Sequence, residues 1–192
     1  MNITLINPRI HDTPNRPLGL LYVAASLEIK GYNVFVLDPH PEESMENICN
    51  YVLKHQPEII GLTATTPQIT KALAISKELK KLSNAPIVLG GVHPTVMYEK
   101  ILTEDYNIDY VVIGEGEVTI IELCKKIKDW ASLSTVKGIA FRQGNSVRIT
   151  ESRGLIADLD SISFPARHLL SSKWHTAPPR IRGVWKKATE IV

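Results

Sequence analysis

The chain has 192 residues, of which 44% are hydrophobic and 22% are charged, and its formal net charge is +2. This length fits one domain of ordinary size with an appendage, and it argues against two full domains. The small net charge predicts neither a nucleic-acid partner nor an anionic membrane surface. Neither a secretory signal nor an apolar run long enough to span a bilayer is visible. Cys49 and Cys124 fall far apart in predicted helices, so we expect reduced thiols and a cytoplasmic protein.

Apolar runs spaced about 25 to 30 residues apart predict the strands of a parallel sheet. They are Ile3–Ile6, Val34–Leu37, Glu58–Leu62, Ile87–Leu89 and Tyr110–Ile113. Helical spacing of apolar residues predicts helices at Leu18–Ile29, Ser44–His55, Thr66–Leu82, Pro94–Leu102 and Glu117–Trp130. The alternation predicts a three-layer, doubly wound α/β fold of the flavodoxin-like type, with a five-stranded sheet in the order 2-1-3-4-5.

The pattern changes after Leu133. Two short runs, Gly138–Arg142 and Ser146–Thr150, flank a glycine-bearing turn and predict a C-terminal hairpin. From Asp158 onward, prolines and scattered basic residues replace the periodic spacing, which indicates a linker and a tail. We therefore expect an α/β domain over residues 1–133, a hairpin and linker over 134–170, and a tail over 171–192.

Small and polar residues follow three successive strands of the predicted sheet. The third strand is followed by Thr63-Ala64-Thr65, the fourth by Gly90-Gly91 and the fifth by Gly114-Glu115-Gly116-Glu117. Glycine lets the backbone turn sharply or approach a ligand closely. Because open parallel sheets bind ligands at the carboxyl ends of their strands, this edge is the predicted binding site.

Two common nucleotide-binding motifs are missing. The first strand is followed by Asn7-Pro8-Arg9 and not by G-x-G-x-x-G, and the sequence contains no G-x-x-x-x-G-K-[ST]. These absences disfavour a dinucleotide-binding or P-loop domain. A receiver domain is also disfavoured, because Asn7 and Thr63 stand where it would need aspartates.

The order and spacing of these strand-end motifs resemble the cobalamin-binding domain of cobalamin-dependent radical S-adenosylmethionine (SAM) enzymes. Pro17–Ala24 looks like the segment that opens the first helix in that family, and Phe164–Arg167 looks like its lead into a second domain. The resemblance covers residues 1 to 170. It implies that cobalamin binds at the carboxyl edge of the sheet and is presented to a radical SAM domain, in cis or in trans.

The resemblance also bears on how the cobalt is held. Methionine synthase-like relatives carry D-x-H-x-x-G, whose histidine ligates cobalt from below. Alignment on Gly19 puts Pro14 and Arg16 in the Asp and His places, and arginine has no lone pair to offer. The base-pocket residues of that fold do match, at Thr63, Thr65, Gly90 and Gly91. Asp38-Pro39-His40 follows the second strand, off the expected loop, and is interpreted as a coincidental D-x-H.

Several side chains at this edge have a second interpretation. Glu115 could bond amide groups on the corrin rim, while it and Glu117 could equally be acids that favour a helix N-terminus. Arg9 and Arg16 could meet a phosphate or be solvated, and His93 is the histidine placed best to touch a ligand. The resemblance implies a cofactor-binding set without catalytic residues or protein ligands to the metal: Asn7, Pro8, Arg9, Arg16, Leu18, Gly19, Thr63, Ala64, Thr65, Gly90, Gly91, Val92, His93, Gly114, Glu115, Gly116 and Glu117.

Radical SAM chemistry needs three cysteines for its [4Fe–4S] cluster, and this sequence contains only Cys49 and Cys124. We therefore expect no iron–sulfur cluster in this chain and no catalysis by it alone. Two other functions stay open at this stage. One is a flavodoxin-like module that binds a nucleotide or flavin, and the other is a small transferase whose base is His93 or Glu115.

Overall fold

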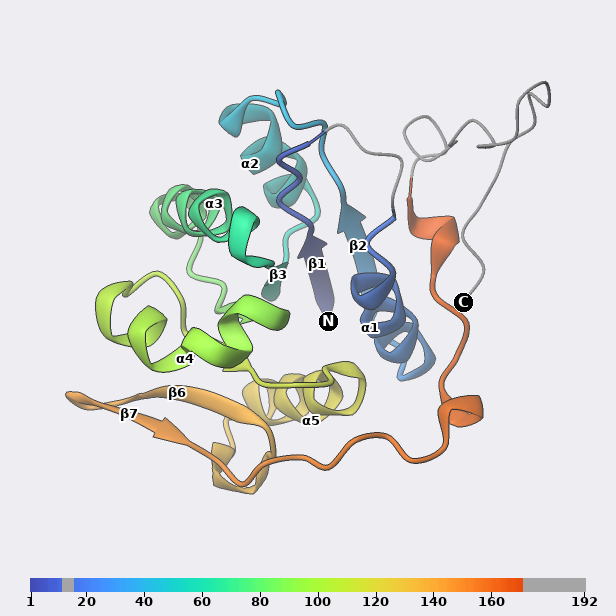
Figure 1. The fold of residues 1–192 in the computed structure, drawn as a ribbon. Helices are drawn as coiled ribbons and strands as arrows, with labels where there is room; N and C mark the ends of the chain where they lie inside the picture. Colours follow the sequence, from blue (N-terminus) through green and yellow to red (C-terminus); the bar gives the residue numbers. More distant parts are fainter. Residues whose placement is uncertain (12–15, 171–192) are drawn as a thin grey trace.

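The structure, a computed structural model, describes residues 1–11 and 16–170 (Figure 1). Its strands are β1 (Asn2–Ile6), β2 (Asn33–Leu37), β3 (Ile59–Thr63), β4 (Ile87–Gly90), β5 (Tyr110–Val112), β6 (Ile139–Gln143) and β7 (Ser146–Ile149). Its α-helices are α1 (Leu18–Ile29), α2 (Met45–Lys54), α3 (Ile69–Leu82), α4 (Val92–Glu104) and α5 (Glu117–Lys128). Short 3-10 helices are η1 (Thr66–Gln68), η2 (Leu133–Thr135), η3 (Leu159–Ser161) and η4 (Arg167–Leu169). The predicted helix over 66–82 is thus divided between η1 and α3.

The sheet confirms the predicted order of its parallel strands. Its full order is β2-β1-β3-β4-β5-β6-β7, and the strands from β2 to β5 pair in parallel. All of their carboxyl ends therefore lie at one edge of the sheet. Strand order reverses between β1 and β3, which is where α/β sheets of this kind open a crevice for a ligand.

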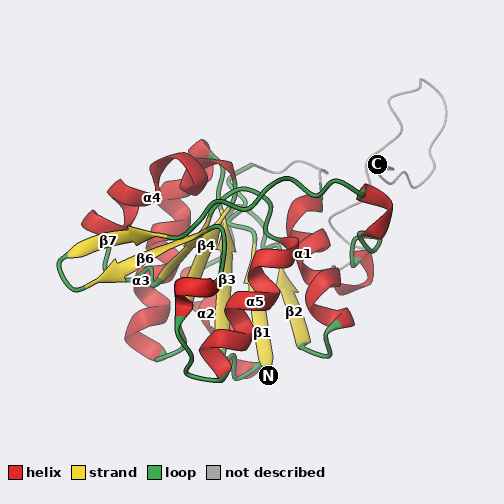
Figure 2. Cartoon of the chain, turned by 90° about the horizontal axis from the view of Figure 1, so that it is seen from below, coloured by secondary structure: helices red, strands yellow, loops and turns green. Residues whose placement is uncertain are grey.

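Helices cover both faces of the sheet (Figures 1 and 2). On one face α1 and α5 pack against β1, β2 and β4, and their core includes Leu21, Leu27 and Leu123. On the other face α2, α3 and α4 enclose a second core that includes Val52, Ile75 and Leu102. Within the described residues, no helix is long and apolar enough to cross a membrane.

The sheet has seven strands where the sequence predicted five, because the hairpin pairs with it. β6 lies antiparallel to β5, with Ala140 opposite Val111, and β7 completes the edge. The unpaired backbone groups along β5 provide the reason, since an exposed strand edge is stabilised by a further strand. The hairpin is therefore an extension of the main sheet.

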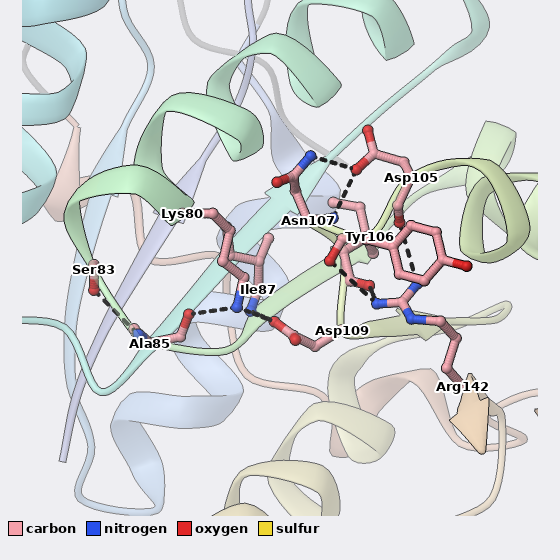
Figure 3. Close-up of polar contacts among 10 residues, drawn as sticks. Lys80, Ser83, Ala85, Ile87, Asp105, Tyr106, Asn107, Asp109 and Arg142 are labelled. Atoms are coloured by element: carbon pink, nitrogen blue, oxygen red, sulfur yellow. Dashed lines mark hydrogen bonds and ion pairs between the residues drawn. The ribbon is translucent and has the colours of Figure 1, made fainter. Parts of the chain in front are cut away.

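Arg142 of β6 fixes the loop between α4 and β5 at the opposite, amino edge of the sheet (Figure 3). Its guanidinium donates to the carbonyl oxygens of Leu102 over 2.9 Å and Asp105 over 3.1 Å, and also bonds that of Ile108. Nearby, one oxygen of Asp109 accepts from the backbone nitrogen of Ile87 over 2.6 Å. These contacts tie β4, β5 and β6 together far from the carboxyl edge.

Residues 150–170, here called the strap, run from β7 past α5 to α1 (Figures 1 and 2). The sequence predicted a linker for most of this stretch, and the strap nevertheless bonds the body of the domain. Arg153 Nε donates to Thr119 Oγ1 over 2.8 Å, and the Ala166 nitrogen donates to the Leu21 carbonyl over 3.1 Å. Ala166 itself is buried. Isolated polar bonds and the packing of Ala166, Leu169 and Leu170 against the core hold the strap, and neither gives a periodic hydrophobic pattern.

Candidate functional site

A cavity of about 610 Å³ opens at the carboxyl edge of the sheet, between the strands and helices α1 and α5. Its apolar lining includes Leu5, Val88 and Val112, which point to the α1 and α5 face of the sheet. Side chains of a strand alternate between the two faces, so Gly61, Thr63 and Gly90 share this face too. The cavity therefore forms where one face of the sheet carries its smallest residues.

The two neighbouring glycines of the fourth strand end differ in what surrounds them. A Cβ added to Gly90 would lie 3.9 Å from its nearest neighbour, Val112 Cβ, so this position borders open space. Gly91 has a φ of +101°, and a Cβ there would lie 2.8 Å from the Ala64 carbonyl oxygen. Gly90 thus leaves room in the cavity, whereas Gly91 serves the close approach of the turn to β3.

Most of the predicted site residues meet at this cavity. Those that line it are Asn7, Arg9, Arg16, Leu18, Gly19, Thr63, Thr65, Gly90, Gly91, Gly114, Glu115, Gly116 and Glu117. Pro8, Ala64, Val92 and His93 do not line it. Ala64 is fully buried, and Val92 is 69% exposed at the start of α4.

His93 and Glu115, the two candidate bases, have partners within the chain. His93 Nδ1 lies 3.1 Å from Thr66 Oγ1. Glu115 lines the cavity, and its Oε2 accepts from the backbone nitrogen of Ile156 in the strap over 2.6 Å. Glu115 therefore anchors the strap beside the cavity.

Glu117 differs from Glu115 in that its Oε2 has no such bond to the part of the chain that the structure describes. It begins α5, where a negative charge is favourable to the helix dipole. Its Oε2 is shielded from solvent and has no hydrogen-bond partner among the described residues. A buried acceptor without a donor is costly, so this oxygen is suited to receive a donor from a molecule in the cavity.

A buried polar group lies at the β1 and β2 side of the cavity. Asn7, Arg9 and Asp38 are each at most 8% exposed. Asn7 Nδ2 donates to Asp38 Oδ1 over 2.8 Å, and Arg9 Nη1 lies 3.7 Å from Asp38 Oδ2. Burial raises the pKa of Asp38 to about 6, against the lowering effects of the Asn7 hydrogen bond and the Arg9 charge. Asp38 is thus a titratable group directly behind two cavity residues.

Sequence reasoning missed several of the residues that shape this region. Gln68 lines the cavity and donates to Asn7 Oδ1 over 2.9 Å. Lys71 donates to the carbonyl oxygens of Arg9 over 2.7 Å and Pro41 over 2.8 Å, which joins two loops at the carboxyl edge. The sequence pattern marks Asp38 only as part of D-x-H. The available signal was its place after β2, beside Asn7 after β1 in the predicted strand order.

The histidines bear on any metal in the cavity. Among the described histidines, His11 lines the cavity, whereas His40 and His93 do not. Arg16, in the place of the expected histidine, also lines it. Pro14, in the place of the motif's aspartate, lies outside the described residues.

Comparison with known proteins places the chain among longer relatives. It is 32% identical over 179 residues to an uncharacterized methyltransferase of Pyrococcus horikoshii, spanning 88% of this chain and 39% of that protein. It is 33% identical over 177 residues to the anaerobic magnesium-protoporphyrin IX monomethyl ester cyclase of Synechocystis sp., spanning 83% of this chain and 34% of the cyclase. The chain thus spans little more than a third of these curated relatives.

A solved structure and a family comparison complete the assignment. The radical SAM methyltransferase TsrM from Kitasatospora setae, with cobalamin and a [4Fe–4S] cluster bound, superposes with a TM-score of 0.71 at 22% identity, covering 98% of this chain and 36% of TsrM. This likeness supports the fold. The sequence model of the B12 binding domain matches residues 12–124. That match covers more than half of the chain, which therefore belongs to the B12 binding domain family.

Proposed function

We propose that the chain binds cobalamin in the cavity at the carboxyl edge of the sheet, with no histidine beneath the cobalt, and presents it to a radical SAM domain. The observation that carries this proposal is the cavity itself. It lies between β1, β3, β4 and helices α1 and α5, and Gly90 leaves its floor open. A flat heteroaromatic base fits between an apolar sheet face and two helices.

Two further features fit cobalamin. The apolar wall of Leu5, Val88 and Val112 would suit the flat base of the cofactor's nucleotide tail. The shielded Oε2 of Glu117 can accept from an N–H or O–H group, and cobalamin carries both on its amides and ribose. The cavity thus offers apolar contact and a matching acceptor.

Arg16 supports the absence of a histidine ligand. Its guanidinium is always protonated and cannot coordinate a metal. His11 lines the same cavity, so it is the described histidine that an experiment has to test.

The relatives support the part of the proposal that concerns a partner domain. Cobalamin supplies a cobalt centre that carries and transfers a methyl group, and the chain contributes its position and surroundings. TsrM holds cobalamin and a [4Fe–4S] cluster within a chain of which the present one matches 36%. We propose that residues 1–133 form the cofactor-binding unit, with 134–170 leading toward the catalytic domain. The tail predicted over 171–192 lies outside the described residues.

Replacement of Gly90 by valine tests the cavity assignment. The branched side chain would project into the open space beside Val112, so we expect the Kd for hydroxocobalamin to rise at least about tenfold. The measurement is corrinoid retained after desalting, with circular dichroism to check the fold. Gly154→Val is the matched control, because Gly154 has open space around it in the strap and lies outside the cavity lining. Equal retention by both variants would refute the assignment.

A further inference from the structure

Four polar side chains form a continuous series of hydrogen bonds across the carboxyl ends of β2, β1 and β3. Asn7 Nδ2 donates to Asp38 Oδ1 over 2.8 Å, and Gln68 Nε2 donates to Asn7 Oδ1 over 2.9 Å. Gln68 Oε1 accepts from the Thr65 backbone nitrogen over 3.0 Å and from the Thr65 hydroxyl over 2.8 Å. We call Asp38, Asn7, Gln68 and Thr65 the polar relay.

Both ends of the polar relay fix the direction of its hydrogen bonds. An ionised carboxylate only accepts, and a backbone N–H only donates. Asp38 therefore requires the amide nitrogen of Asn7, and Thr65 requires the amide oxygen of Gln68. A single orientation of the two amides satisfies both ends. In that orientation the Thr65 hydroxyl donates its hydrogen bond to Gln68, so its oxygen can only accept from any other partner.

We propose that Asp38 is a positioning residue of the cavity, which acts through Asn7 and Gln68 to hold Thr65 as an acceptor for a ribose hydroxyl of the bound cofactor. Asn7, Gln68 and Thr65 line the cavity, and Asp38 lies outside its lining. The inference rests on the proposed function, because cobalamin is the molecule expected in the cavity. The inference adds Asp38, which lies outside the cavity lining and sets whether the Thr65 hydroxyl acts as a donor or an acceptor toward the cavity.

Charge-swapping variants test the direction of the polar relay. In Gln68→Glu, the carboxylate introduced at position 68 faces the side-chain oxygen of Asn7. If the Asn7 amide turns over to donate to that carboxylate, its oxygen faces Asp38 instead. Each orientation contains one contact between two acceptors. In Asp38→Asn, the new amide oxygen still accepts from Asn7. In the double variant, the amide introduced at position 38 is able to donate to Asn7, and Asn7 is able to donate to the carboxylate introduced at position 68. A complete series therefore forms in the reverse direction.

The expected result is that the second substitution rescues the first. Urea unfolding of the protein without cofactor should give a lower midpoint for Gln68→Glu than for the wild type, and adding Asp38→Asn should raise that midpoint. Gln143→Glu is the matched control, because Gln143 is exposed at the end of β6, outside the polar relay. Its effect should simply add to that of Asp38→Asn. The gain from Asp38→Asn should be larger in Gln68→Glu than in the wild type, and a gain of the same size or smaller overturns the relay.

Corrinoid binding tests the positioning role. Cobinamide has the corrin ring and lacks the base, ribose and phosphate of cobalamin. Gln68→Glu should raise the Kd for cobalamin about tenfold, leave the Kd for cobinamide within about twofold, and recover in the double variant. Equal changes for both corrinoids, or no change, overturn the positioning role even where unfolding shows rescue. A wild-type chain that binds neither corrinoid refutes the proposed function and the role of Thr65 toward the cofactor. The urea-unfolding experiment tests the polar relay independently of that result.

Discussion

Asp38 combines burial with a nearby positive charge, and burial has the larger effect on its pKa. It is 8% exposed, and the charge of Arg9 at 3.7 Å offsets only part of the cost of ionising it. The pKa in the folded chain, about 6, therefore lies above the ordinary value of 3.8. Near neutral pH the folded domain thus contains a buried carboxylate whose ionisation lowers the stability of the fold.

This difference predicts how stability depends on pH. A raised folded-state pKa contributes stability that is fully present below about pH 3.8 and is lost as pH rises through about 6. Relative to Asp38→Asn, which does not titrate, the wild type should lose up to about 3 kcal/mol of unfolding free energy between pH 4 and pH 7.5. Urea unfolding of both proteins across this range measures it. If the difference in unfolding free energy between the two proteins stays constant with pH, or grows in favour of the wild type, the raised pKa of Asp38 is contradicted.

At the scale of elements, the alternating strands and helices were predictable because each has a local signal. The bounds of α1, Leu18–Ile29, agree with the prediction, since Pro17 precedes it and Gly31 adopts a φ of +79° after it. Pairing of the hairpin with β5 was not predictable, because register between distant strands leaves little trace in one sequence. The strap was missed for a related reason, since contacts such as Ile156 to Glu115 join residues 41 positions apart.

The residues of the candidate site likewise divide into those that the sequence predicted and those that it did not. Glycine and threonine positions after the strands were predictable from sheet geometry, and residues such as Thr63, Gly90 and Gly116 do line one cavity. The different roles of Gly90 and Gly91 depend on a backbone angle and on the position of Ala64, which no local pattern reveals. Gln68 was missed because its importance comes from a bond to Asn7, 61 positions away.

Arg142 predicts a separation between stability and binding. Its guanidinium serves several carbonyl groups of one loop, so Arg142→Lys keeps the charge and loses the fork of donors. We expect the unfolding free energy to fall by about 1–3 kcal/mol, while cobalamin affinity changes by less than about twofold because the loop lies at the amino edge. Urea unfolding and corrinoid titration provide the two measurements. Arg148→Lys should cost less, because the Arg148 guanidinium on the outer strand β7 bonds the side chain of Gln143 and no loop carbonyl of the described residues. A larger effect on affinity than on stability would argue against this separation.

Considered as a whole, the two edges of the sheet differ: side chains tie down the amino edge, and the carboxyl edge is the one at which we propose that the cofactor binds. The amino edge is closed by Arg142 and Asp109, with their bonds to backbone atoms (Figure 3). The carboxyl edge carries the cavity, the polar relay and the strap. The sheet thus supports a candidate site made largely of strand ends and loops, which suits the proposed binding of a cofactor.

The central claim is that this chain holds cobalamin with neither the cofactor's base nor a protein histidine on the cobalt. The direct measurement is the electron paramagnetic resonance spectrum of the chain, loaded with hydroxocobalamin, desalted and reduced to Co(II). The account predicts about one cobalt per chain and a spectrum without nitrogen superhyperfine splitting, unchanged in His11→Ala. If no cobalt is retained, cobalamin binding is contradicted. A nitrogen triplet would contradict the claim that neither a histidine nor the cofactor's base lies on the cobalt.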